Sequence, residues 1–309
     1  MKKLQAKVVK STGAWYDLIS EDGMLLKARL KGNLRLEGLS STNPVAVGDN
    51  VTLTLENGDW MIGEIADREN YIIRKSPSRK GQYHILAANI DQAFLLITIS
   101  KPRTSTGFID RFLVTAEAYQ IPSILVFNKQ DALTEKDKIV QDNLIETYTE
   151  IGYECLLVSS KTGEGIKEII ENMKGKTTLL AGHSGVGKST FANAIDNNLD
   201  LRTAEVSKKY EKGRHTTTFA EMFPLKFGGN IIDIPGIKEF GLVDFEEEDI
   251  SHFFPEMASL LPECKFNNCM HINEPDCAVL AALEEGKITE FRYQNYLNMV
   301  NDINEEKEY

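Results

Sequence analysis

The chain has 309 residues, of which 42% are hydrophobic and 26% charged, and a net charge of −11. This composition excludes a disordered chain, and the length is typical of a folded protein with two or three domains. The acidity lies at the C-terminal end: residues 1–79 hold 12 Lys and Arg against 10 Asp and Glu, whereas residues 243–309 hold 4 against 16. The N-terminal part can therefore still face RNA.

The sequence shows no export signal and no membrane span. The longest apolar run, Ala93–Ile99, has the length of a buried strand and is far too short to cross a bilayer. We therefore expect a cytoplasmic monomer with no membrane partner.

Short strands separated by turns are predicted over residues 1–70. Met24–Lys31 and Val51–Leu55 alternate apolar and polar residues, which is typical of half-buried strands. Asn57-Gly58 is a strong hairpin turn before another strand, Trp60–Ile65. About five short strands in this length predict a small β-barrel, with the oligonucleotide-binding (OB) barrel as one candidate.

One face of the strand Met24–Lys31 carries three basic residues, Lys27, Arg29 and Lys31. The residue pattern alone favours a solvated strand face over contact with RNA. Both interpretations stay open at this point.

From about residue 85 the pattern changes to apolar strands that alternate with helical segments. Strands are predicted at Ala93–Ile99, Ser123–Phe127, Glu154–Val158, Thr177–Ala181 and Asn230–Asp233. Phe108–Tyr119 and Asp137–Ile151 have the apolar spacing of helices. The alternation predicts an α/β domain with a mostly parallel sheet and helices on both faces.

Asn128-Lys129-Gln130-Asp131 directly follows a predicted strand and resembles the N-K-x-D signature of Ras-like GTPases. There the Asp carboxylate accepts hydrogen bonds from N1 and N2 of guanine, a pair of donors that adenine lacks. Ser159-Ser160-Lys161 follows the next strand and resembles the S-A-K motif that backs the base. Either motif alone could be a surface loop, but both at strand ends predict a guanine site.

Gly182-His183-Ser184-Gly185-Val186-Gly187-Lys188-Ser189 matches the phosphate-loop pattern G-x-x-x-x-G-K-[ST] and opens a predicted helix, Thr190–Ile195. In such a loop, backbone N–H groups surround the β-phosphate of a nucleotide. Lys188 is expected to bridge the β- and γ-phosphates, and the Ser189 hydroxyl to bind Mg²⁺. A Gly-rich turn without function is the alternative, which the flanking strand and helix disfavour.

Two further segments resemble the switch motifs of Ras-like GTPases. In Asp233-Ile-Pro-Gly236, which resembles D-x-x-G, Asp233 is expected to hold Mg²⁺ through a water molecule and Gly236 to sense the γ-phosphate. Gly213–Thr218 resembles the first switch loop, with Thr217 as the residue that closes on Mg²⁺.

The base motifs precede the phosphate loop, the reverse of the usual order, so the sequence is circularly permuted.

Cys264, Cys269, His271 and Cys277 form a cluster in the acidic, helical C-terminal part. Three thiolates and one imidazole are a complete tetrahedral set for Zn²⁺, and four protein ligands indicate a structural site. Buried thiols with a chance histidine are the alternative. Cys155, on an apolar strand, is expected to be a core residue.

Over nearly its whole length the chain resembles the circularly permuted RsgA GTPases of bacteria. The resemblance rests on the barrel, Ala87–Gln92, Asn128–Asp131, the phosphate loop, Gly213–Thr218 and Cys264–Cys277. It implies GTP hydrolysis stimulated by the 30S ribosomal subunit and a role in late 30S maturation. It also favours contact of the basic strand face with 16S rRNA.

The resemblance implies three domains. These are an OB-like RNA-binding barrel (1–70), the circularly permuted GTPase domain (71–242) and a helical zinc-binding domain (243–309). The expected cofactors are GTP or GDP, Mg²⁺ and one structural Zn²⁺.

The sequence lacks the glutamine that orients the attacking water in Ras-like enzymes, because Ile237 follows Gly236. We therefore expect slow hydrolysis alone and activation by a partner that completes the site. His215 is the candidate for the missing orienting group, and a solvent-facing loop residue is the alternative. Gly185 stands where some GTPases carry an Asn that recruits K⁺, so potassium dependence by that route is not expected.

Two other functions fit part of the sequence. An RNA-binding assembly scaffold with structurally bound GTP would leave the switch motifs without a role. A P-loop metabolic kinase would leave Asn128–Asp131 without one. Both are disfavoured for these reasons.

Overall fold

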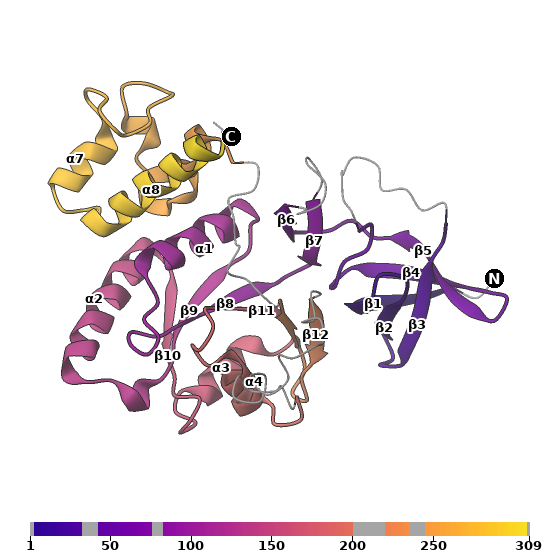
Figure 1. Cartoon of the computed structure of the whole chain (residues 1–309). Helices are drawn as coiled ribbons and strands as arrows, with labels where there is room; N and C mark the ends of the chain where they lie inside the picture. The colour runs from indigo at the N-terminus through magenta and orange to yellow at the C-terminus, as the bar shows by residue number, and fades with distance from the viewer. Residues whose placement is uncertain (1–2, 33–42, 76–82, 200–219, 235–244, 308–309) are drawn as a thin grey trace.

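The chain folds into three parts: an N-terminal β-barrel, a central sheet covered by helices, and a helical C-terminal part (Figure 1). The structure is a computed structural model that describes residues 3–32, 43–75, 83–199, 220–234 and 245–307. The predicted fold class, an OB-like barrel followed by a mostly parallel α/β domain and a helical domain, is confirmed.

Among the described residues, five strands form the barrel: β1 (Lys3–Ser11), β2 (Tyr16–Ser20), β3 (Leu25–Leu30), β4 (Asn50–Glu56) and β5 (Asp59–Ile65). Their order is β1-β2-β3-β5-β4, and β4 pairs back with β1, which closes the barrel. Closure of this kind leaves no strand edge unpaired. The interior is apolar, with Val8, Leu18, Ala28, Leu53 and Ile62 all 0% exposed.

The strand predicted to have one basic face is β3. Ala28 is buried inside the barrel, whereas Lys27 and Arg29 are exposed outside. The guanidinium carbon of Arg29 lies 4.0 Å from the ring centroid of Trp15, which is a cation–π contact. The outer face of β3 is thus basic with an aromatic neighbour.

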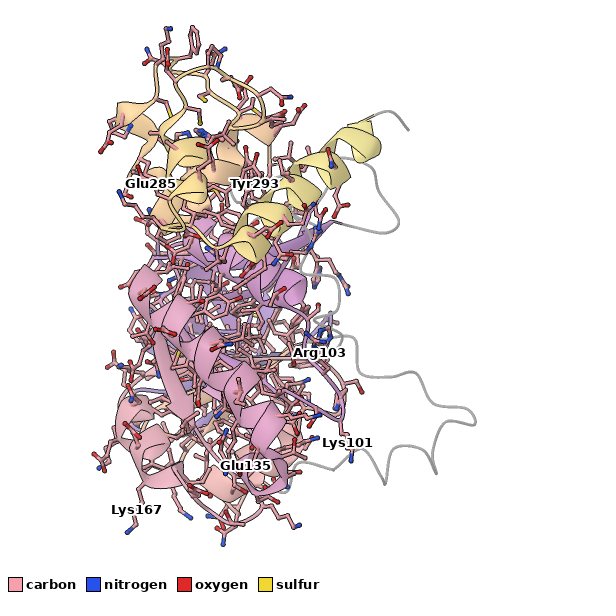
Figure 2. The ribbon with its side chains drawn as sticks, turned by 90° about the vertical axis from the view of Figure 1, so that its left-hand side faces the viewer. Lys101, Arg103, Glu135, Lys167, Glu285 and Tyr293 are labelled. Atoms are coloured by element: carbon pink, nitrogen blue, oxygen red, sulfur yellow. The ribbon has the colours of Figure 1, made fainter. Side chains whose placement is uncertain are left out.

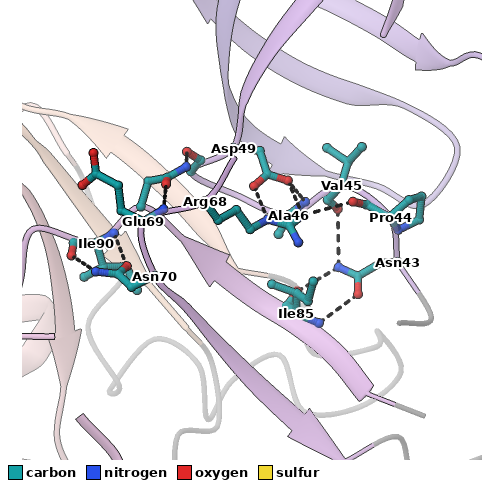
Figure 3. Close-up of polar contacts among 12 residues, drawn as sticks. Asn43, Pro44, Val45, Ala46, Asp49, Arg68, Glu69, Asn70, Ile85 and Ile90 are labelled. Carbon is teal, nitrogen blue, oxygen red and sulfur yellow. Dashed lines mark hydrogen bonds and ion pairs between the residues drawn. The ribbon is translucent and has the colours of Figure 1, made fainter. Parts of the chain in front are cut away.

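A hairpin that the sequence pattern did not predict, β6 (Tyr71–Lys75) with β7 (Tyr83–Ala88), leads from the barrel to the central sheet. Just before it, Arg68 makes two hydrogen bonds of 2.7 Å to the fully buried carboxylate of Asp49 (Figure 3). Arg68 also donates to the Pro44 carbonyl oxygen at 3.0 Å. A bidentate pair of this kind is geometrically specific, so it fixes the segment before β4 against the connection from β5 to β6.

The backbone of the segment before β4 also lies very close to the end of β7. Gly48 has a φ angle of 94°, and a Cβ there would lie 1.9 Å from the carbonyl oxygen of Ala88, so the position requires glycine. The Asn70 side chain pairs with both backbone groups of Ile90, at 2.8 Å each (Figure 3).

Within the described ranges, six strands form the central sheet: β8 (Gln92–Ile97), β9 (Ser123–Phe127), β10 (Glu154–Leu157), β11 (Thr177–Ala181), β12 (Glu221–Pro224) and β13 (Asn230–Asp233). Their order is β10-β9-β8-β11-β13-β12, and only β12 is antiparallel to its neighbour among these described strands. The five predicted strands are confirmed, each within two residues of its expected ends.

Helices cover both faces of this sheet, as predicted. They are α1 (Thr106–Ala118), α2 (Glu135–Ile151), α3 (Ile166–Met173) and α4 (Lys188–Ile195), with the short 3-10 helix η1 (Gln130–Ala132) after β9. Alternate strand residues face opposite sides, so Leu95 packs with α1 and α2 and Leu96 with α3 and α4. Strands buried on both faces produce the continuous apolar runs seen in the sequence.

The end of β1 stays paired with β2 of the barrel and also pairs with β12 on its other side, where Lys10 lies directly opposite Glu221. In the part of the chain that the structure describes, barrel and central sheet thereby form one sheet of eleven strands. The Lys10 ammonium lies 2.8 Å from a carboxylate oxygen of Glu221. One strand is thus shared between the two parts.

The C-terminal part contains η3 (Glu247–Phe253), α6 (Pro255–Ala258), η4 (Leu261–Glu263), α7 (Ala278–Glu284) and α8 (Glu290–Lys307). Figure 2 shows it at one end of the central domain, opposite the end that carries Lys101 and Glu135. Its apolar core includes Val114 of α1. No helix in the described residues is long and apolar enough to span a membrane.

A buried polar network fastens α8 to the central domain. The Arg292 guanidinium donates to Asp110 of α1 at 2.7 Å and to both carboxylate oxygens of Glu256 at 2.7 and 2.9 Å. Tyr148 of α2 and Asn295 also donate to Asp110, at 2.7 and 2.6 Å. Buried polar groups need such partners, so the network specifies one docking position.

Candidate functional site

The loop between β11 and α4, predicted to bind phosphate, has three glycines with positive φ angles. Gly182, Gly185 and Gly187 have φ angles of 138°, 86° and 100°, which residues with a side chain rarely adopt. A Cβ on Gly182 would lie 2.7 Å from the Leu96 carbonyl oxygen, and one on Gly187 would lie 2.8 Å from the Asn128 amide nitrogen. The first and last of these positions therefore require glycine.

The Lys188 ammonium points back into this loop. It donates to the carbonyl oxygens of Gly182 at 2.6 Å and His183 at 3.0 Å. Burial lowers the pKa of Lys188, and the carboxylate of Asp233 opposes that fall. The His183 ring contacts the ring of Phe108 of α1, with centroids 3.6 Å apart and planes tilted by 32°, so the loop is held against α1.

Asn128 connects the base motifs to the phosphate loop. Its amide nitrogen donates to the Val186 carbonyl oxygen at 2.9 Å, and its side-chain oxygen accepts from the Ser160 backbone N–H at 3.1 Å and hydroxyl at 2.9 Å. Asn128 is 2% exposed, where an unpaired amide would be costly. One buried side chain thus joins three of the predicted motifs.

Lys129 makes a second connection to the loop. Its ammonium donates to the carbonyl oxygen of Gly185 at 2.7 Å and to that of Lys101, between β8 and α1, at 2.8 Å. Gln130 points elsewhere and bonds to Gln141 of α2 at 2.7 Å. Gln130, the variable residue of the N-K-x-D motif, therefore stabilises the turn after β9 and does not point toward the phosphate loop.

The carboxylate of Asp131 is held by the second base motif. It accepts a hydrogen bond of 2.7 Å from the Ser159 hydroxyl, and the Lys161 ammonium lies 3.6 Å from its other oxygen. The Ser159 hydrogen bond keeps the pKa of Asp131 below its ordinary value, and Lys161 adds to this effect. Asp131 is therefore an ionised acceptor at neutral pH.

A cavity of about 260 Å³ lies between the base motifs and the phosphate loop. Both motifs and the start of α4 contribute its lining: Asn128, Lys129, Asp131, Ala132, Ser160, Lys161, Gly187 and Thr190. The Asp131 carboxylate at one side can accept hydrogen bonds from a ring that carries donor groups. The N-terminus of α4 at the other side can bind an anion joined to that ring.

Asp233 ends β13 beside the phosphate loop. Burial raises the pKa of Asp233, Glu221 on the neighbouring strand raises it further, and Lys188 opposes the rise. Ser189 is half-buried in the first turn of α4, and Ser184 of the loop is exposed. A hydroxyl and a carboxylate are oxygen ligands of the kind that Mg²⁺ prefers.

His215, Thr217 and Gly236, together with Ile237, lie outside the described residues. Their roles stay predictions.

The C-terminal cluster has the geometry of a metal site. One ligand atom from each of Cys264, Cys269, His271 and Cys277 lies within 4.8 Å of all the others. The Nδ1 atom of His271 lies 3.7 Å from the Cys264 sulfur and 3.3 Å from the Cys277 sulfur. The four residues could hold a metal ion. Cys155 lies apart on β10 and is only partly buried against the sheet core.

Residues around the cluster hold its loop in place. His271 has a φ angle of 56°, and its carbonyl oxygen accepts from the Tyr293 hydroxyl at 2.7 Å. Tyr296 donates to the Met270 carbonyl oxygen at 2.6 Å. The Glu274 carboxylate accepts three backbone N–H groups of the same loop. Such outer contacts orient metal ligands.

Two contacts at the site were not predicted. The Lys101 carbonyl oxygen accepts from Lys129, and Phe108 packs on His183. No motif marks these residues. Only the pairing of β8 with β11 could have placed the loop after β8 next to the phosphate loop.

A parallel sheet with a glycine-rich loop before a helix, and base-binding motifs that come earlier in the chain, defines a circularly permuted P-loop GTPase. Comparison with known protein families supports this class. The family model described as RsgA GTPase matches residues 65–243, and the RsgA N-terminal domain matches residues 5–60.

Curated relatives are similar along their whole length. The small ribosomal subunit biogenesis GTPase RsgA of Bacteroides fragilis is 52% identical over 305 residues, which are 98% of each chain. That of Christiangramia forsetii is 50% identical over 301 residues and 96% of each chain.

Solved structures show the same arrangement. YjeQ from Thermotoga maritima has a TM-score of 0.81 and 35% identity, covering 97% of this chain and 98% of its own. The circularly permuted GTPase YloQ has a TM-score of 0.77 and 29% identity, covering 99% and 96%. The chain therefore belongs to the RsgA family of GTPases, and the predicted family and GTP hydrolase class are confirmed.

Proposed function

We propose that this protein hydrolyses GTP to GDP and phosphate, slowly alone and faster on the 30S subunit, during late maturation of that subunit. The observation that carries the proposal is Asn128, whose buried side chain bonds to both the phosphate loop and Ser160. Base and phosphate motifs that share one side chain form a site for a single nucleotide. The relatives, GTPases of small ribosomal subunit biogenesis, support the cellular role.

In this proposal Asp131 accepts the N1 and N2 hydrogens of guanine. The other base-binding residues are Asn128, Lys129, Ser159, Ser160 and Lys161, and the phosphate-binding residues are Gly182, His183, Ser184, Gly185, Val186, Gly187, Lys188, Ser189 and Thr190. Gln130, predicted as part of the base motif, bonds to Gln141 instead and is not included. Lys188 and the loop N–H groups neutralise the charge that develops as the γ-phosphoryl group passes to water.

Mg²⁺ supplies further positive charge at the phosphates when it is bound. Ser189 and Asp233 are the described residues that would hold it, Asp233 through a water molecule, with Thr217 as the third. Gly236 senses the γ-phosphate. With Ile237 in the glutamine position, we propose His215 as the residue that holds the attacking water and a bound partner as the activator.

Multiple-turnover phosphate release, measured with and without 30S subunits, tests this function. We expect 30S subunits to raise turnover about 10²–10⁴-fold, the usual contribution of a completed proton-transfer or water-orienting group. His215→Ala should lose the stimulated part and keep GTP binding. Tight GTP binding without turnover in either condition would instead favour the RNA-binding scaffold with structural GTP.

We propose that the ion held by Cys264, Cys269, His271 and Cys277 is one structural Zn²⁺. Three thiolates, which are soft ligands, and one imidazole form a set that binds Zn²⁺ in tetrahedral geometry. Four protein ligands leave no position for a reacting water. The site therefore stabilises the C-terminal domain.

Loss of zinc is expected to unfold the C-terminal domain, because structural zinc contributes about 10–16 kcal/mol of binding free energy in zinc-finger peptides. Native mass spectrometry should find one Zn²⁺ per chain and none in Cys277→Ser, whose melting temperature should fall. Cys155→Ser is the matched control and should keep the ion, since that thiol lies outside the cluster. Zinc retained by Cys277→Ser with unchanged melting would contradict the assignment.

We propose that the outer face of β3 contacts 16S rRNA. The exposed Lys27 and Arg29 offer charge to phosphates, and Trp15 offers a ring beside them. Lys31 adds to this face but is paired with Glu56 at 2.7 Å.

The domains are proposed as 1–70 for RNA binding, 71–242 for GTP hydrolysis and 243–309 for zinc. We propose that the protein works as a monomer in the cytoplasm, where small subunits mature.

A further inference from the structure

Four charged side chains form a row from the barrel to the phosphate loop. Lys10 of β1 lies directly opposite Glu221 of β12, and Glu221 lies directly opposite Asp233 of β13. Residues directly opposite in antiparallel strands point to the same face, with Cβ atoms about 5 Å apart. At the end of the row, the carboxylate of Asp233 interacts electrostatically with the ammonium of Lys188.

The two carboxylates in the middle of this row, those of Glu221 and Asp233, have different neighbours. Glu221 is paired with Lys10 at 2.8 Å, and the two side chains are 32% and 34% exposed. Asp233 faces the phosphate loop on the other side. Two neighbouring carboxylates raise the negative potential between them, and a cation relieves it. The charge on Lys10 therefore determines how much of the field of Glu221 reaches Asp233.

We propose that Glu221 is a positioning residue that strengthens the hold of Asp233 on Mg²⁺, and that Lys10 of the barrel sets the size of this effect. The proposal rests on the proposed function, in which Asp233 holds Mg²⁺ through a water molecule. A carboxylate on the adjacent strand attracts a divalent cation, and an ion pair with Lys10 cancels part of that attraction. One pair of side chains thus connects the barrel electrostatically to the nucleotide site.

The connection works in both directions, as any coupling between binding sites must. An anion that takes Lys10 away from Glu221 tightens Mg²⁺ binding at Asp233. Conversely, Mg²⁺ bound with GTP draws Glu221 away from Lys10 and frees the lysine for an anion. Lys10 and Glu221 both line an open cavity of about 550 Å³ beside β2 and β3, so a phosphate group of RNA can reach the pair.

The Mg²⁺ dependence of the release of a fluorescent GDP analogue from the full chain tests this connection without hydrolysis. Glu221→Gln should raise the Mg²⁺ concentration needed for half-maximal retention about three- to tenfold, and Lys10→Met should lower it by a similar factor. The Lys10→Met shift should be smaller in the Glu221→Gln background than in the wild type, because without Glu221 the Lys10 side chain is no longer held on the side of Asp233. Lys10→Arg should keep the wild-type value, and added salt should shrink both shifts.

Lys138→Met is the matched control, since it removes the same charge from an ion pair of 2.9 Å on α2 and should change nothing. Release that is independent of Mg²⁺ in the wild type would overturn the proposed nucleotide site itself. Dependence in the wild type without a shift in Lys10→Met, or a double variant that retains the full Lys10→Met shift, would overturn only the coupling. If Glu221→Gln loses GDP affinity even without Mg²⁺, its fold is damaged, and the comparison of Lys10→Met with Lys10→Arg decides.

Discussion

Replacing Arg292 with methionine is expected to destabilise the protein by about 3–5 kcal/mol. The guanidinium is 1% exposed and is paired with Asp110, which is 0% exposed, and with Glu256. Methionine fills similar space but leaves the carboxylates of Asp110 and Glu256 without a positive partner. They lie where water cannot solvate them in its place. The free energy of urea unfolding, followed by circular dichroism, measures the loss.

Two further variants separate the buried charge from the loss of contacts in general. Arg111→Met breaks an exposed ion pair with Asp302 on the same pair of helices and should cost less than about 1 kcal/mol. Adding Asp110→Asn and Glu256→Gln to Arg292→Met should restore much of the stability, because no buried charge is then unpaired. A loss in Arg292→Met no larger than that in Arg111→Met would contradict the argument.

Asp131→Asn is expected to weaken GTP binding about 100-fold or more, because a site built to hydrogen-bond a group strongly rejects a mismatched partner. In the proposed site the carboxylate accepts both hydrogens of the guanine edge, whereas an amide offers one acceptor and one donor. The amide would suit xanthine, which carries an oxygen in place of the guanine amino group. Competition of GTP, ATP and XTP against a fluorescent GDP analogue measures the change.

The expected pattern for Asp131→Asn is a loss for GTP, a gain for XTP and no change for ATP. Asp142→Asn, an exposed change on α2, removes the same charge and should leave all three affinities as they are. Equal affinity of Asp131→Asn and the wild type for GTP would show that the cavity does not read guanine through this carboxylate.

Local sequence patterns were sufficient for the central fold and for the placement of the base and phosphate motifs at one edge of its sheet. Thr177–Ala181 and Asn230–Asp233 were predicted with their observed bounds, because apolar runs between turns define buried parallel strands. Asn128–Asp131 and Gly182–Ser189 come directly after strands of one sheet. Parallel strands bring such loops to one edge whatever their order along the chain.

Long-range pairing could not be predicted, because it depends on register. Arg68 and Asp49 are 19 residues apart and Arg292 and Asp110 are 182 apart, yet each pair is buried. Charged residues in a sequence are expected at the surface, so such pairs become visible only in the folded chain. The shared strand β1 was missed for a similar reason: it contacts two bodies and carries no simple alternation of buried residues.

The barrel is attached to the rest of the molecule at two separate places. On one side β1 pairs with β12 of the central sheet at Lys10 and Glu221, and elsewhere the segment before β4 pairs with β7 through Val47 and Ala87. Two attachments hinder rotation of the barrel about either one. We therefore expect the outer face of β3 and the phosphate loop to keep a nearly fixed separation, so that both can meet only a surface with a matching spacing.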